Sequence, residues 1–189
     1  MKKTIVLFMF LILFFIMVST GCSQKSDIPL EQENSKIAET NPESAKAQNT
    51  YGALSIDSQK ELTIEEMLTY AIQDEYLARA EYKYVSEELG ATRPFTNIIK
   101  AEEEHIAALK PLFDEMNLEV PEDKAAEYLI KPASESEALE IGVEAEIKNI
   151  AMYEEFLKKS LPDEVRIVFE ELKRGSENHL KAFRQDRGR

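Results

Sequence analysis

Hydrophobic side chains recur along most of the chain at alternating steps of three and four residues, which is the spacing of the buried face of an α-helix. Four segments show this pattern, at about residues 63–89, 94–117, 134–159 and 162–184. Polar residues occupy the positions between the apolar ones. Each segment therefore predicts an amphipathic helix with one inward-facing stripe.

Glycine and proline mark where these helices are expected to begin, end or bend. Gly90 should end the first helix, and Pro94 should open the second. Pro111 falls inside the second pattern and is expected to kink or break that helix, because proline cannot donate a backbone hydrogen bond. Gly175 lowers the helix propensity of the fourth segment, so we interpret it as a position of close packing.

Four amphipathic helices of similar length predict an all-α fold, an antiparallel four-helix bundle. Short turns join the helices in two pairs, whereas residues 118–133 form a longer connection between the second and third helices. At about 3.3 Å per residue, this connection can run the length of a bundle, which favours a crossover topology. An up-down-up-down arrangement is the competing topology.

The N-terminal residues predict an export signal. Two lysines precede an apolar run over residues 5–18, and the small residues STG then lead to Cys22. A membrane-spanning helix needs about 20 apolar residues, so a cleaved signal is favoured over a retained anchor. The segment resembles the lipobox of bacterial and archaeal lipoproteins, which implies a lipid on Cys22, although Ser19 stands where leucine is usual. Plain secretion is the other alternative.

The sequence thus divides into three predicted parts. Residues 1–21 form a lipoprotein-type signal peptide, residues 22–57 the lipidated cysteine and a flexible polar tether, and residues 58–189 the bundle domain. The tether is assigned from its polar composition and lack of sustained periodicity, and the presence of short helices within it is left open. The expected location is outside the cytoplasm, anchored to the cell membrane by the lipid.

Composition narrows the functional classes. The chain has 36 acidic against 23 basic residues and a net charge of -13, which argues against nucleic acid as a partner. One cysteine excludes a disulfide framework and any CxxC metal or redox motif. Most of the acidic residues are expected on the solvated faces of the helices.

Polar residues interrupt every apolar stripe near its middle. They are Glu75 in the first helix, Glu102 and His105 in the second, Glu146 in the third, and Ser176 and His179 in the fourth. An unpaired carboxylate inside a bundle costs several kcal/mol, so three converging carboxylates call for a cation. Carboxylates and imidazoles on facing helices are the ligands of di-iron and di-manganese bundles. We therefore predict a metal site made of these three carboxylates and two imidazoles.

The motifs at these positions resemble those of the ferritin-like superfamily. The stretch EYLAR from Glu75 is similar to the E-x-x-A-R of rubrerythrin-type helices, and Glu102 with His105 is similar to their E-x-x-H. The stretch GSENHLKAF, which ends the fourth helix, looks like the corresponding part of the DUF2202 family. The resemblance implies a metal ligand at Glu75, a bridging Glu102 and a terminal His105. The third helix matches less well, and only Glu146 is carried over from it.

One departure from the di-iron pattern leaves the number of metal ions open. Ser176 stands where a complete site has glutamate, and Asn149 lies near a position that is often acidic. Hydroxyl and amide oxygens are weak ligands for hard divalent cations, so one ion is expected and a second stays open. Tyr82 and Tyr153 follow Glu75 and Glu146 by seven residues, so with Ser176 they are candidates to hydrogen-bond the ligands. Ordinary core packing is the alternative for both tyrosines.

Two functional classes follow. The first is a membrane-tethered, non-haem iron oxidoreductase that reacts with oxygen or peroxide, as a ferroxidase or peroxidase does. It would hold one or two iron ions, with manganese as the alternative, and would take electrons from an external donor. The second is a non-catalytic metal-binding or interaction module with a degenerate di-iron site. The expected partners are metal ions, the membrane and a second copy of the chain in a homodimer. A bundle without metal is the remaining alternative.

Overall fold

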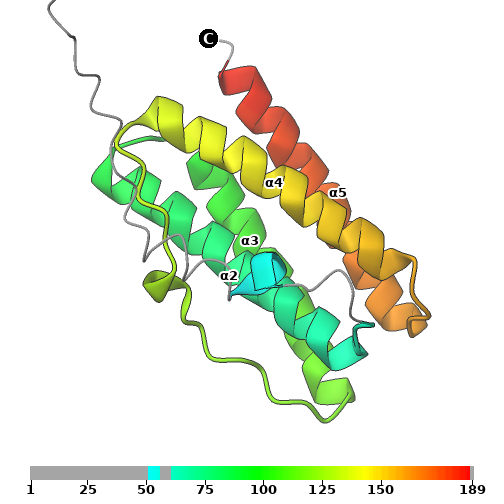
Figure 1. The fold of residues 1–189 in the computed structure, drawn as a ribbon. Coiled ribbons are helices and arrows are strands. Elements are labelled where there is room, and N and C mark those ends of the chain that lie inside the picture. Colours follow the sequence, from blue (N-terminus) through cyan, green and yellow to red (C-terminus); the bar gives the residue numbers. More distant parts are fainter. Residues whose placement is uncertain (1–50, 56–60, 188–189) are drawn as a thin grey trace, which may run out of the picture. The chain divides into compact units, whose positions relative to one another are not determined.

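The structure is a computed structural model and describes residues 51–55 and 61–187. In this part of the chain it contains four α-helices, two short 3-10 helices and no strand, which confirms the all-α four-helix bundle (Figure 1). The α-helices are α2 (Ile64–Glu88), α3 (Phe95–Glu115), α4 (Glu135–Leu157) and α5 (Asp163–Asp186). The predicted signal peptide, Cys22 and residues 22–50 of the predicted tether lie outside the described residues.

The helix ends follow the local signals in the sequence. Thr63 caps α2, because its side chain accepts a hydrogen bond from the Glu66 N–H at 3.2 Å while the Glu66 carboxylate accepts one from the Thr63 N–H at 2.9 Å. Gly90 follows α2 with a φ of +69°, the left-handed conformation that favours glycine. Ser134 caps α4, because its side-chain oxygen accepts a hydrogen bond from the Glu137 N–H at 3.2 Å.

Helix α3 contradicts one prediction, because it continues through Pro111 without a break. Proline removes the hydrogen bond to the carbonyl four residues earlier, which belongs to Ala107. Both Pro111 and Ala107 are exposed, so water can satisfy that carbonyl. Of the predicted kink or break at Pro111, the break is therefore wrong.

Side-chain contacts between α2 and α4 establish how the helices run. Glu75 accepts a hydrogen bond from Tyr153, and Glu146 accepts one from Tyr82, so α2 and α4 are antiparallel. Short turns make α2 antiparallel to α3, and α4 antiparallel to α5 (Figure 1). Helices α3 and α4 consequently run in the same direction. The chain between them passes back along the bundle before α4 begins (Figure 1).

Polar contacts hold this connection against α2. Arg79 forms an ion pair with Asp123 at 2.5 Å, and the Ile130 N–H donates to Glu81 Oε1 at 3.2 Å. Between these contacts lies the 3-10 helix η2 (Ala125–Glu127), which also packs on α2. The connection is therefore attached to α2 at Arg79 and Glu81 and packs on this helix through η2.

Residues 51–55, which the sequence analysis placed in the tether, pack against the bundle. Tyr51 is 4% exposed and stacks on Tyr128 with ring centroids 4.5 Å apart. The 3-10 helix η1 (Gly52–Ser55) follows, and the Ala53 N–H donates to Asp74 Oδ1 at 2.8 Å. One buried ring and a few backbone hydrogen bonds attach residues 51–55 to the bundle. Such an attachment needs no repeating apolar pattern, so the sequence did not reveal it.

Two apolar clusters fill the bundle. One contains Leu68, Leu109 and Phe169, and the other contains Val85 and Phe95. On α3, α4 and α5 the residues of one cluster precede the polar interruption and those of the other follow it. On α2 the division is the same, except that Tyr76, directly after Glu75, belongs to the first cluster. The polar level therefore lies between two dry layers of side chains. Among the described residues, no helix is long and apolar enough to span a membrane.

Candidate metal centre

The five predicted ligands lie at the same level of the bundle. Glu75 on α2 is 0% exposed, and Glu102 on α3 and Glu146 on α4 are each 1% exposed. His179 on α5 is buried as well, whereas His105 on α3 is partly exposed. Three carboxylates from three helices thus meet in a core where ions are otherwise costly.

These side chains form two overlapping groups. Donor atoms of Glu75, Glu102 and His105, here called the first triad, lie within 4.8 Å of one another. The same holds for Glu102, Glu146 and His179, the second triad. Glu102 belongs to both, with Oε2 next to His105 and Oε1 next to His179. This arrangement places one carboxylate between two sets of ligands, as a bridging ligand requires.

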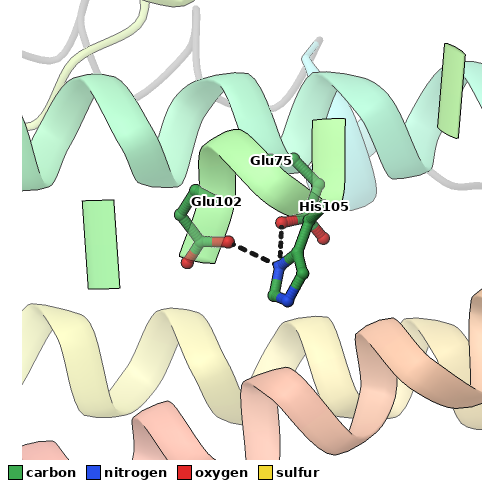
Figure 2. Close-up of side chains that lie close together, drawn as sticks. All are labelled: Glu75, Glu102 and His105. Carbon is green, nitrogen blue, oxygen red and sulfur yellow. Dashed lines mark hydrogen bonds and ion pairs between the residues drawn. The ribbon is translucent and has the colours of Figure 1, made fainter. Parts of the chain in front are cut away.

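Hydrogen bonds satisfy the first triad within the protein. Figure 2 shows the His105 ring beside both carboxylates, with Nδ1 2.8 Å from Glu102 Oε2 and 3.0 Å from Glu75 Oε2. The Tyr153 hydroxyl donates to the other Glu75 oxygen, Oε1, at 2.7 Å. Both oxygens of Glu75 therefore have a partner.

The second triad is less well satisfied. His179 Nδ1 lies 3.1 Å from Glu102 Oε1 and 3.5 Å from Glu146 Oε1, close enough for an ion pair, but neither contact has hydrogen-bond geometry. The Tyr82 hydroxyl donates to Glu146 Oε1 at 2.9 Å, and Glu146 Oε2 has no hydrogen-bond partner among the described residues. A buried acceptor left unsatisfied costs about 1–3 kcal/mol, so such atoms are expected where a bound ion completes the site.

Burial and mutual charge shift the acid–base behaviour of the ligands. Burial, followed by the charge of Glu102, raises the pKa of Glu75 to about 7. Burial also opposes ionisation of Glu102, but the hydrogen bond to His105 and the neighbouring His179 imidazole hold its pKa below the usual value. Burial disfavours the imidazolium ions too, yet the carboxylates outweigh it and raise the pKa values of His105 and His179 to about 10. Without metal, the imidazolium charges offset the carboxylates, and metal binding must release those protons.

The two predicted tyrosines hydrogen-bond the carboxylates across the bundle. Each lies seven residues after one glutamate, but Tyr153 on α4 donates to Glu75 on α2, and Tyr82 on α2 donates to Glu146 on α4. Burial, followed by the carboxylate charges, raises the pKa of both phenols well above the usual value. Both hydroxyls therefore remain protonated donors that orient the ligands.

Two residues of α5 shape the space beside the ligands. Ser176 is 1% exposed and lies one turn before His179, where the resemblance expected glutamate. A Cβ atom on Gly175 would lie 2.4 Å from Nε2 of His105, so only glycine leaves room for the ring in this position. The predicted close packing at Gly175 is therefore the packing of α5 against His105.

Three polar residues near the centre, Asn149, Glu81 and Asp74, were not predicted as site residues. Asn149 is 7% exposed, and its Oδ1 has no hydrogen-bond partner among the described residues. Glu81 is 5% exposed, and burial raises its pKa to about 7, as it does for Asp74. The spacing of Asp74, Ala78 and Glu81 is helical, so a second stripe beside the apolar one was the available signal.

The donors suit a hard or borderline divalent cation. Carboxylate oxygens with imidazole nitrogens are typical ligands of iron and manganese in bundles, and no thiolate lies among them. Gly175 leaves room for His105, and the second triad has buried atoms without partners. The residues present therefore fit one metal ion in each triad.

Fold and site together define a four-helix bundle protein with a buried carboxylate–histidine cluster. Residues 64–188 match the family described as an uncharacterized protein domain, DUF2202, and the chain belongs to this family. This confirms the resemblance to DUF2202 seen in the fourth helix.

A protein of Methanocaldococcus jannaschii, uncharacterized protein MJ0754, is similar in sequence and fold. It is 31% identical over 104 residues, a match that covers 47% of this chain and 56% of that protein. The chain therefore spans about half the length of this relative. The crystal structure of MJ0754 superimposes with a TM-score of 0.59 at 25% identity, and covers 70% of this chain and 86% of that one. The helical fold thus recurs in an archaeal protein.

Proposed function

We propose that the protein binds divalent metal, iron above manganese, in the two triads and acts as a non-haem iron oxidoreductase toward oxygen or peroxide. The observation that carries the proposal is the division of Glu102 between His105 and His179 in a buried layer. Two triads that share a carboxylate have the donors of a dinuclear centre. We also propose that the bundle belongs to the ferritin-like superfamily, which the parallel course of α3 and α4 supports.

Charge supports binding at this level of the core. The three carboxylates and two neutral imidazoles carry a formal charge of about -3, which one divalent ion reduces and two reverse. In the second triad, an ion would bind atoms of Glu146 and His179 that have no hydrogen-bond partner, which makes its binding more favourable. In the first triad, an ion would have to replace existing hydrogen bonds, so its binding is less favourable there.

Residue roles follow from the contacts. Iron held by Glu75, Glu102, His105, Glu146 and His179 would supply the electrons that reduce oxygen or peroxide. Glu102 holds both triads together, and Tyr82 and Tyr153 orient the outer carboxylates. The apolar layers above and below keep bulk water from the cluster. The described residues include no cysteine, so the reductant would be an external donor.

A second candidate function is a non-catalytic metal-binding module. Ser176 favours it, because a hydroxyl replaces the carboxylate that would complete a symmetric ligand set. Such a module would bind metal with the same residues and turn nothing over.

One experiment separates these candidates. The full-length protein is loaded with Fe(II) without oxygen, its metal content is measured, and Fe(II) oxidation is followed after oxygen or peroxide is added. The double variant Glu102→Ala, His105→Ala should lose metal and rate, whereas Glu104→Ala, an exposed neighbour, should keep both. Stoichiometric iron that oxidises no faster than iron without protein leaves the binding module. A wild-type protein without stoichiometric metal refutes both functions.

We further propose that Cys22 carries a lipid that anchors the domain outside the cytoplasm. The support is the sequence alone, namely the apolar run and the small residues before the cysteine. Cell fractionation tests it: the wild-type chain should be in the membrane fraction and Cys22→Ala should leave it. An unchanged distribution argues for a retained anchor instead.

A further inference from the structure

A cavity of about 100 Å³ lies beside the proposed metal centre, between α2 and α4. Tyr82, Glu146 and Asn149 form part of its lining, so the cavity reaches a carboxylate of the second triad. Ala53 of η1 and Ile130 of the connection also line it. A space of this size has room for a few water molecules or a partly hydrated ion.

Two buried acceptors in this lining have no partner. Glu146 Oε2 and Asn149 Oδ1 lack hydrogen-bond partners among the described residues, and the two residues are 1% and 7% exposed. Tyr82 engages the other oxygen of Glu146, so Oε2 is the one left for a ligand in the cavity. The two residues are three positions apart on α4 and therefore share a face. Paired oxygen acceptors suit a cation with oxygen ligands.

Acidic residues outnumber basic ones in the rest of the lining. Asp74, Glu81 and Glu144 line the cavity, and Lys148 is the one basic residue of the lining. Backbone N–H groups fix two of these carboxylates, through Ala53 N to Asp74 Oδ1 at 2.8 Å and Ile130 N to Glu81 Oε1 at 3.2 Å. Clefts lined by one sign of charge concentrate ions of the opposite sign.

We propose that this cavity is the route by which divalent cations reach and leave the metal centre, with Asn149 Oδ1 and Glu146 Oε2 as a transient binding position on the way. The inference rests on the proposed metal-binding function. The rim residue Glu144 attracts the ion, the paired oxygens replace part of its water shell, and Glu146 passes it to the second triad. Asn149 in this scheme governs the rate of loading and not the number of ions bound.

Loading kinetics test the route with the full-length chain. Metal-free protein is mixed rapidly with Co²⁺, and the ligand-field absorbance of the bound ion is followed to its end point. Asn149→Leu replaces the amide by an apolar side chain of similar volume and should slow loading about tenfold. Asn149→Asp keeps an oxygen acceptor at this position and should load at the wild-type rate. Ala145→Leu fills the cavity and should also slow it. Glu140→Gln, an exposed acid on α4 outside the lining, should load as the wild type does.

The rate and the end point answer different questions. Slower loading with an unchanged number of ions supports the route. Wild-type rates in both Asn149→Leu and Ala145→Leu overturn it, and would mean that ions enter elsewhere, for example beside His105, whose side chain is 14% exposed. If Ala145→Leu does not fold, Glu144→Lys at the exposed rim takes its place and should slow loading through charge alone. A wild-type protein that binds no stoichiometric Co²⁺ or Fe²⁺ refutes the metal-binding function itself.

Discussion

The two triads share Glu102 but differ in how far the protein satisfies them by itself. In the first triad, Glu75 has a hydrogen-bond partner on each oxygen, and His105 contacts two carboxylates. In the second, Glu146 Oε2 and His179 Nδ1 are buried without hydrogen-bond partners among the described residues. The same types of side chain thus have their hydrogen bonds satisfied within the protein in the first triad, but not in the second.

This difference has an energetic consequence for metal binding. An ion in the first triad must replace hydrogen bonds that already exist, whereas an ion in the second relieves acceptors that cost free energy without it. Access also favours the second triad, because Glu146 lines the cavity beside α4 and Glu75 does not. We therefore expect the first ion to bind in the second triad.

The largest expected effect is the loss of both triads at once. Glu102→Ala removes the shared carboxylate and leaves His105 and His179 with one fewer partner each. Breaking a buried charged cluster costs about 3–5 kcal/mol, so the affinity for Fe²⁺ or Mn²⁺ should fall at least about 100-fold. Isothermal titration measures it, with Glu104→Ala as the exposed control. Retention of one tight ion would mean that the triads are independent.

Removing one histidine at a time should separate the two triads. His105→Ala is expected to leave one ion bound in the second triad, and His179→Ala to leave one in the first. The ion left by His179→Ala should bind about tenfold more weakly than the ion left by His105→Ala, because the first triad has no unsatisfied buried atom for the ion to bind. Titration of both variants with the same metal gives the comparison. Equal affinities would remove the proposed order of binding.

A smaller and one-sided effect is expected from Gly175→Ala. The added Cβ would lie 2.4 Å from His105 Nε2, so the ring must move and Nδ1 with it. Affinity in the first triad should fall about tenfold while the second triad is unaffected. Gly142→Ala is the matched control, because its Cβ would press on the Phe183 ring at 2.9 Å, outside the ligand set. It should lower the melting temperature without changing metal stoichiometry.

The smallest effect concerns pH. In the metal-free protein the pKa values of His105 and His179 are raised from 6.5 to about 10, so the charged imidazoles stabilise the fold fully below pH 6.5 and lose that contribution as pH rises through 10. The neutral form of Glu75, with its pKa raised to about 7, contributes below pH 4.5 and is lost through pH 7. The melting temperature should therefore fall from pH 6 to pH 10, and bound metal should flatten this fall.

Glu81 provides the control for this pH dependence because it lies outside both triads. Burial raises its pKa to about 7, so its ionisation destabilises the fold as pH rises through that value. Glu81→Gln keeps the acceptor for the Ile130 N–H and should raise the melting temperature at pH 8 more than at pH 5. This gain should appear with or without metal. A gain only in the metal-free protein would indicate coupling between Glu81 and the metal centre.

Sequence periodicity predicted the four helices closely, with each end within about two residues of the structure. It also placed Glu75, Glu102 and His179 on inward faces, because the side-chain direction along a helix depends only on residue spacing. Pro111 was misjudged because a single residue does not show whether the freed carbonyl lies in solvent. Tyr51 was missed because one aromatic ring has no period.

The sequence by itself thus determined the fold class and which polar side chains point inward, since both follow from local spacing and capping. Only the tertiary structure decided that Glu102 lies between His105 and His179, and that each tyrosine bonds the glutamate of the opposite helix. Those contacts depend on the relative height and rotation of helices far apart in the chain. The cavity beside Asn149 and the fit of His105 against α5 depend on the same variables, which no single helix encodes.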